Sequence, residues 1–312
     1  MGFRRSFLSG SAALAAGLML MAGCGRRPPA ESSDITPSFS ISRARSPLGS
    51  AVEITYTWKT GADFKKLDKE YRSLVHFLDS HRVMLFEDDH VPVPAPSEWE
   101  AGQTYTYTRT KFIPIYPYVG DVEVRMGLTP PSGRGERLAL KGEDGGLREY
   151  SVGSIELLPQ TENIFLVHKS GWHSPEAFPD NPSLERTWTE KEALVSFKNP
   201  KKDVVLFLEA DTNAKAFKAP PVLTVSIGDN GLEIPIESSE VFLKKIKFAA
   251  DTLGDGDWVD LQLAMSGAFV PAEIGLNQDE RELALLVYHL YVGEVGELGE
   301  VVGEVVDAGP LG

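Results

Sequence analysis

Short segments in which apolar and polar residues alternate run along most of this chain. Val52, Ile54, Tyr56 and Trp58 occupy every second position, with polar residues between them. The same alternation is found in four further segments, at 104–108, 122–128, 223–227 and 259–265. Because side chains of an extended strand point to opposite faces in turn, each segment predicts a half-buried β-strand.

The spacing of these segments indicates the fold class. They recur roughly every ten to fifteen residues, separated by Gly, Pro and Asp, which is typical of an all-β sandwich rather than of βαβ units. Segments 204–208 and 283–292 are apolar at both parities, as central strands are. Composition also allows a helix at 283–292, but its Val and Tyr residues favour a strand. Helical spacing is found in 64–71, where we expect one short helix.

One strand carries a change of phase. Tyr150 and Val152 share one parity, Ile155 and Leu157 share the other, and Gly153-Ser154 lies at the switch. A β-bulge at that point would keep all four apolar side chains on the core face.

The N-terminus has the layout of an export signal. Arg4 and Arg5 precede an uncharged apolar run at 12–22, which is too short to span a bilayer as a helix. Residues 21–24, Met-Ala-Gly-Cys, resemble a lipobox, and Cys24 is the only cysteine. We expect residues 1–23 to be a signal peptide and Cys24 to carry the lipid that anchors the chain in the membrane. The alternative is an ordinary buried cysteine.

Arg4 and Arg5, followed by Ser, Phe and Leu, also resemble the twin-arginine export signal, although a generic basic segment fits equally. The segment 24–34 reads as a polar tether. The expected location is the bacterial cell envelope, with the outer membrane indicated in a Gram-negative cell because Gly rather than Asp follows Cys24.

Net charge and chain length indicate which partners are excluded and how many domains to expect. The net charge is -14, and removing residues 1–23, which hold two arginines and no acid, makes it -16. Such a body should repel nucleic acid. Two β-sandwich domains are expected, at 35–158 and 159–293, because a strand ends at Pro159. The Gly/Glu/Val-rich tail at 294–312 is expected to be poorly ordered.

Two groups of segments resemble known modules. Those at 75–79, 86–90, 97–99 and 102–105 resemble an immunoglobulin-like or fibronectin-like sandwich that accompanies bacterial envelope proteins, including soluble tails of membrane glycosyltransferases. Those at 171–176, 186–189, 269–276 and 281–283 are similar to a jelly-roll module of the same class of proteins. The resemblance implies a place near envelope glycans and no defined activity.

Acidic residues provide two candidate cation sites. Asp88 and Asp89 lie in a Glu-Asp-Asp-His segment, and Asp255 and Asp257 precede Trp258. Calcium is the cofactor such residues suggest, but it prefers six to eight oxygen ligands. Adjacent positions also alternate faces, so the sequence favours ordinary turns at both places and no cofactor.

Aromatic residues provide a candidate ligand site. Trp172, His173 and Glu176 lie in a loop after a strand, where an aromatic ring beside polar groups can stack on a sugar. Trp99 has the same status. The alternative, which the sequence favours for Trp172, is a ring folded back onto the end of the sandwich. Trp58, Trp188 and Trp258 are expected in the core.

Catalytic motifs are missing from the sequence: it contains no nucleophile elbow, zinc-helix histidines, phosphate loop or dinucleotide fingerprint. The prediction is a non-catalytic, lipid-anchored binding or scaffolding protein, associated with envelope glycans or proteins. Two alternatives stay open. One is a carboxylate-based enzyme acting on envelope polysaccharide, and the other is a structural partner in a protein assembly.

Overall fold

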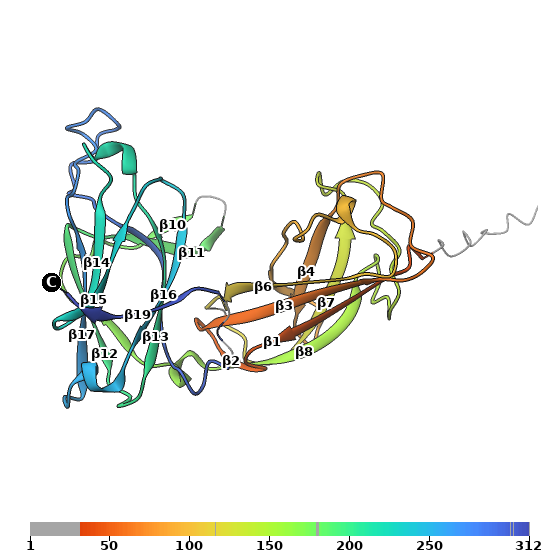
Figure 1. Ribbon diagram of the computed structural model, residues 1–312, viewed down its shortest axis with the longest axis horizontal. Helices are drawn as coiled ribbons and strands as arrows, with labels where there is room; N and C mark the ends of the chain where they lie inside the picture. Colours follow the sequence, from red (N-terminus) through yellow and green to blue (C-terminus); the bar gives the residue numbers. More distant parts are fainter. Residues whose placement is uncertain (1–31, 116, 179–180, 300, 302, 312) are drawn as a thin grey trace, which may run out of the picture. The chain divides into compact units, whose positions relative to one another are not determined.

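The protein is all-β, as the alternation predicts (Figure 1). A computed structural model describes residues 32–115, 117–178, 181–299, 301 and 303–311. The predicted signal peptide, with Arg4 and Arg5, and the lipidation site Cys24 lie outside these residues. The described chain forms twenty strands and four 3-10 turns, the turns being η1 (Pro96–Glu98), η2 (Gln160–Glu162), η3 (Ala214–Ala216) and η4 (Ala250–Leu253). None of its helices has the length and hydropathy needed to cross a membrane.

The first eight strands form an immunoglobulin-like sandwich. One sheet has the order β1 (Ile35–Ile41), β3 (Ala51–Thr60), β6 (Thr104–Phe112). The other has the order β2 (Arg45–Pro47), β8 (Tyr150–Leu158), β7 (Gly120–Thr129), β4 (Arg72–Leu78), β5 (Met84–Glu87). Strands β1, β3 and β6 correspond to A, B and E of an immunoglobulin fold, and β4, β7 and β8 to C, F and G.

The remaining strands form a jelly roll. One sheet has the order β10 (Glu176–Phe178), β11 (Asn181–Trp188), β18 (Leu286–Glu294), β13 (Val204–Asp211), β16 (Phe242–Phe248), β19 (Val305–Asp307). The other has the order β20 (Gly309–Pro310), β15 (Asn230–Pro235), β14 (Val222–Ile227), β17 (Trp258–Met265), β12 (Glu192–Lys198), β9 (Leu166–His168). Strands β11 to β18 are divided between the two sheets, four in each, in the eight-stranded, double Greek-key arrangement of a jelly roll.

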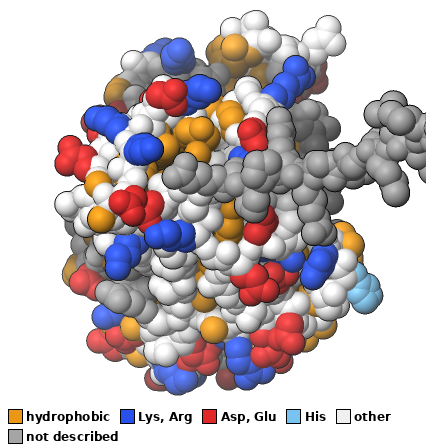
Figure 2. Space-filling view, turned by 90° about the vertical axis from the view of Figure 1, so that its right-hand side faces the viewer, with side chains coloured by type: hydrophobic (Ala, Val, Ile, Leu, Met, Phe, Trp, Pro, Cys, Tyr) orange, Lys and Arg blue, Asp and Glu red, His pale blue; other side chains and the backbone are white. Residues whose placement is uncertain are grey.

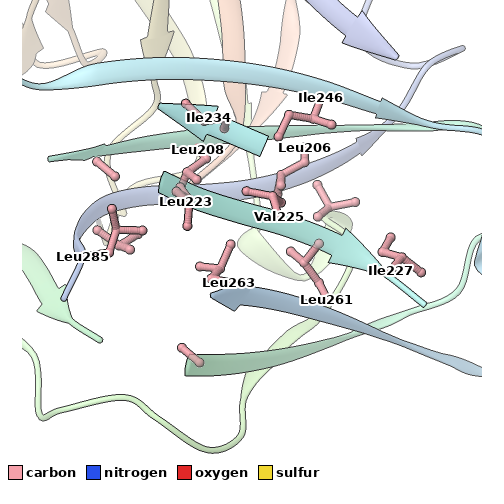
Figure 3. Packing of buried hydrophobic residues seen from close by; sticks show 14 of the residues in the cluster. Leu206, Leu208, Leu223, Val225, Ile227, Ile234, Ile246, Leu261, Leu263 and Leu285 are labelled. Carbon is pink, nitrogen blue, oxygen red and sulfur yellow. The ribbon is translucent and has the colours of Figure 1, made fainter. Parts of the chain in front are cut away.

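The alternating segments supply the cores. Val259, Leu261, Leu263 and Met265 of β17 are buried, whereas Asp260 and Gln262 between them are exposed. Figure 3 shows Leu261 and Leu263 facing Leu206 and Leu208 across the jelly-roll interior. Each leucine buried in this way contributes about 1.5–3 kcal/mol to folding, so the alternation of apolar positions accounts for much of the stability.

The predicted bulge in β8 is confirmed. The β7–β8 register shifts between Val124 and Arg125, whose partners are Gly153 and Ser151, so Val152 is the extra residue. Tyr150, Val152, Ile155 and Leu157 all pack in the core of the first sandwich. The strand predicted at 283–292 is confirmed as β18 over most of its length.

Two predicted elements are wrong. Residues 64–71 form no helix, because backbone and side-chain oxygens of Asp34 accept hydrogen bonds from Gly61 and Asp63 and hold the segment irregular while Phe64 packs in the core.

The tail after residue 293 is partly in the fold. Strand β19 pairs in parallel with β16, and β20 pairs with β15. Both additions cover sheet edges, whose unpaired backbone groups offer hydrogen bonds to any strand.

A third apolar cluster combines residues of both sandwiches. Ala51 and Phe112 pack with Phe207, Tyr291 and Leu298. Beside it, Lys245 Nζ donates a 2.6 Å hydrogen bond to Glu53 Oε1, with both residues buried.

Candidate ligand-binding site

A bulge in β18 builds a polar and aromatic patch on one sheet of the jelly roll. Glu209 of β13 pairs with His289, but the next residue, Ala210, pairs with Val287, so Tyr288 is the extra residue of β18. Ala210 and Val287 point into the core. Tyr288 and His289 therefore both point to the opposite face, where Glu209 and Asp211 also lie, because bulges re-aim side chains.

Asp211 and Tyr288 form the centre of this patch. The Tyr288 hydroxyl donates a 2.7 Å hydrogen bond to Asp211 Oδ2. Burial raises the pKa of Asp211, against the opposing effects of this hydrogen bond and of Arg186. Burial, together with the Asp211 carboxylate, raises the pKa of Tyr288 to about 12. At neutral pH the hydroxyl therefore keeps its proton and acts as a donor.

Arg186 and Phe178 complete the patch. The guanidinium carbon of Arg186 lies 5.0 Å from the centre of the Phe178 ring, within cation–π range. The Phe178 and Tyr288 ring centres are 5.9 Å apart. Within the described chain, Arg186 Nε is buried and makes no hydrogen bond. We name Phe178, Arg186, Asp211 and Tyr288 the β18 patch.

Charged pairs border the β18 patch. His289 Nδ1 and Glu209 Oε2 are 2.6 Å apart, with side chains 40% and 31% exposed. Glu176, a predicted ligand contact, is the cross-strand partner of Arg186 and so lies on the same face. Its Oε1 accepts a 2.7 Å hydrogen bond from Arg281.

The other predicted ligand residues of this loop lie elsewhere. Trp172 donates a 2.9 Å hydrogen bond from Nε1 to the Leu194 carbonyl, stacks on His168 at 3.9 Å and packs against the jelly-roll core. This placement matches the alternative of a ring folded back on the sandwich. His173 Nε2 lies 2.7 Å from the Glu282 carbonyl oxygen.

The prediction that Trp99 contacts a ligand is wrong. Its side chain is fully buried in the first sandwich, between Trp58 and Tyr105, and Nε1 donates to the Pro94 carbonyl. The prediction that Trp258 is in the core is also wrong, because the residue is 48% exposed and meets the exposed Phe165 edge to face. Trp258 shares its parity with Asp260 and Gln262, so the sequence held the signal for its exposure.

Asp88 does not fit the predicted cation site. It is buried and accepts hydrogen bonds from Tyr56 and Arg109 while Lys111 lies 3.6 Å away. Burial alone would raise the pKa of Asp88, but Lys111 and Arg109 outweigh it and the pKa is lowered. The Asp88 carboxylate is thus neutralised by the side chains of Arg109 and Lys111 and not by a metal ion.

Asp89 points to the other face of its segment, as the alternation predicts. Its Oδ1 accepts a 2.9 Å hydrogen bond from the Val75 amide, and it lies beside His76 and Glu87. Asp255 and Asp257 are exposed in a turn, and the Asn199 side-chain amide donates hydrogen bonds to the Gly254 and Gly256 carbonyls of that turn. Within the described chain, the convergent group of potential metal ligands is that of Asp89 and does not include Asp255 or Asp257.

A cavity of about 400 Å³ lies beside segment 161–165. Its size suits a small ligand. However, three of its charged lining residues are paired already, Arg43 with Glu297, and Glu294 with Lys202 outside the lining. Asn163 Oδ1 in this cavity and Arg186 Nε in the β18 patch are both buried without a hydrogen bond within the described chain. The β18 patch is the stronger candidate because it adds two neighbouring aromatic rings to such an atom.

Comparisons with known proteins give no family. No family model and no curated protein matches the chain. Among solved structures, the chain is similar to an alkylpurine DNA glycosylase from Pseudomonas fluorescens bound to DNA containing an abasic-site analogue, with 14% identity and a TM-score of 0.22. The match covers 40% of this chain and 30% of that one. So low a TM-score supports no inference about function.

Proposed function

We propose that this chain is a lipid-anchored protein of the bacterial envelope that binds glycans at the β18 patch without catalysing a reaction. The observation that supports this function is the combination of two aromatic rings, a carboxylate and a guanidinium with a buried, unpaired N–H on one sheet face. Sugars present apolar C–H faces that pack on aromatic rings, and hydroxyls that hydrogen-bond to charged groups.

Charged side chains of both signs cover the face shown in Figure 2, where Lys and Arg are interspersed with Asp and Glu. The net charge of -14 therefore does not form a single acidic patch on this face.

A carboxylate-based enzyme is the second candidate. Glu209 and Asp211 lie on one face of β13, and a carboxyl group whose pKa is raised by burial can act as a general acid. Both carboxylates are already held, by His289 and Tyr288 respectively. This arrangement favours binding over turnover. An assembly role, through contact with other envelope proteins, is the third candidate.

The test is a glycan screen of the full-length protein in detergent, measuring both retention and product release. Phe178→Ala and Arg186→Gln should each weaken retention about tenfold, equivalent to a loss of about 1.4 kcal/mol. Trp258→Ala, which removes an exposed aromatic ring from another part of the jelly roll, is the matched control and should bind normally.

Three outcomes would contradict the proposal. Release of product from any glycan would show an enzyme, and loss of retention only in the Trp258 variant would place the site elsewhere. Failure to retain any glycan, with protein partners recovered by cross-linking in cells, would favour the assembly role.

A further inference from the structure

Three side chains that commonly bind metals converge on the outer face of the first sandwich. His76 of β4 and Glu87 of β5 are cross-strand partners, and Asp89 follows two residues after Glu87. One ligand atom from each residue lies within 4.8 Å of the other two. Ligands about 2.1 Å from one zinc ion are about 3.4 Å apart, so closing the site requires side-chain rotation, for which the exposed Glu87 has room.

The backbone fixes two of these residues. Asp89 Oδ1 accepts the Val75 amide hydrogen, which holds the carboxylate against β4 and leaves Oδ2 for an ion. Glu87 is held by its pairing with His76. His76 and Glu87 thus lie on the two strands of the β4–β5 hairpin, and Asp89 lies in the segment directly after β5.

A fourth residue orients the imidazole. Glu149 Oε2 lies 3.3 Å from His76 Nδ1, and Glu149 Oε1 is held at 2.6 Å by Arg137. A carboxylate on one nitrogen of a histidine is the usual partner of a metal-bound imidazole, because it fixes the ring and its tautomer. With Nδ1 beside Glu149, Nε2 is the ring nitrogen left for an ion.

Nearby cations do not neutralise the two carboxylates. Arg125 is the cross-strand partner of His76 on β7, but its guanidinium donates hydrogen bonds to both oxygens of Glu123 and to the Gly145 carbonyl. Lys111 is directed to the Glu87 carbonyl and to Asp88, and Arg72 donates a 3.2 Å hydrogen bond to the backbone carbonyl of Asp89.

We propose that His76, Glu87 and Asp89 bind a divalent transition-metal ion of the zinc class, with Glu149 as a positioning residue. One imidazole with two carboxylates suits zinc, whereas calcium requires six to eight oxygens. Three protein ligands leave a coordination position for water or for an external ligand. The ion would also fix the hairpin that ends at the β5 edge of the sheet.

Titration of the full-length, chelator-treated protein with zinc, followed by calorimetry, tests this site. We expect one zinc ion per chain and a rise in melting temperature. Glu87→Gln should weaken zinc binding at least about tenfold, and Glu149→Gln about 10–100-fold. His81→Gln, at an exposed turn of the same hairpin, and Glu233→Gln, in the jelly roll, are the matched controls and should bind as the native protein does.

Cobalt substitution gives a second measurement. The absorption spectrum of bound cobalt reports its ligand field, and Glu149→Gln should change it by reorienting His76. Because the Glu87 side chain is exposed, Glu87→Gln should fold normally even if His76→Gln does not. The proposal is wrong if zinc does not bind, if Glu87→Gln and His81→Gln bind it equally, or if calcium binds more tightly than zinc.

Discussion

Tyr288 and Asp211 are joined by a 2.7 Å hydrogen bond across two strands, although the regular β18 register would place Tyr288 on the opposite face. The bulge makes this pair possible, and the pair sets the charge state of the candidate site. Burial raises the pKa of Asp211, so the folded protein binds the proton of the Asp211 carboxyl group more tightly than the unfolded chain does.

The Asp211 carboxyl group should therefore reduce stability at neutral pH. Its favourable contribution is fully present below the unfolded pKa, about 3.9, and is lost as the pH rises through the higher folded pKa. Asp211→Asn, which keeps an acceptor for Tyr288, should raise the free energy of unfolding at pH 7, with the gain vanishing below about pH 4. Urea denaturation at both pH values measures this, and the exposed Asp229→Asn is the control. A variant less stable than the native protein at pH 7 would contradict it.

His90 should make the first sandwich sensitive to mild acid. The ring is buried, with Nδ1 2.6 Å from the Asp88 carbonyl and Nε2 2.7 Å from the Tyr107 hydroxyl. Burial, aided by Arg109, lowers the pKa of His90 despite the opposing effect of Asp88. Its contribution is present above the unfolded pKa of about 6.5 and is lost as the pH falls through the folded pKa.

His90→Gln should therefore flatten the fall in stability below about pH 6.5, whereas His81→Gln at the exposed turn should not. The pKa of His168 is also lowered by burial, so some pH dependence should persist. Urea denaturation at several pH values checks this expectation. Identical pH profiles for the two variants would count against it.

Replacing only one partner of the Glu53–Lys245 ion pair should destabilise the protein. Both side chains are less than a tenth exposed. Glu53→Gln removes the carboxylate charge that faces this buried ammonium group and should lower the free energy of unfolding by up to about 3–5 kcal/mol. Glu53→Met combined with Lys245→Met should recover most of this loss. A double variant no more stable than Glu53→Gln would refute the interpretation.

The C-terminal strands should be required for stability. Ending the chain at Gly293 removes β19 and β20 and the buried Leu298, and exposes the edges of β16 and β15. Uncovered edges promote aggregation. We expect a lower melting temperature and larger species in size-exclusion chromatography, whereas removal of residues 311–312 alone should have a small effect. Unchanged stability after the larger truncation would show that these strands are dispensable.

Cys24→Ser tests the predicted lipid anchor. Without a thiol there is no attachment point for the acyl chains that hold such a protein on a membrane. The variant should move from the membrane to the soluble fraction on cell fractionation, as judged by immunoblotting. If it stays with the membrane, the anchor is not the lipid on this residue.

The candidate site was only marginally predictable. Glu176 lies at its border, but Asp211 and Tyr288 carry no distinctive motif, and Tyr288 reaches the outer face only because one residue is added to β18. Trp99 was expected at a ligand site, yet its ring is buried against Trp58 of β3, which is distant in sequence. His76 joins Glu87 and Asp89 through strand pairing, which local sequence does not specify.

The sequence by itself determined the all-β class, the core positions of the alternating strands and the presence of a bulge beside Gly153, because burial of one sheet face requires a period of two and any phase change must be absorbed locally. Tertiary structure decided which side chains meet across strands and which strands the C-terminal segment joins. These contacts depend on register between distant segments and on the edges that other strands leave unpaired. The β18 patch and the zinc site proposed here are products of that register.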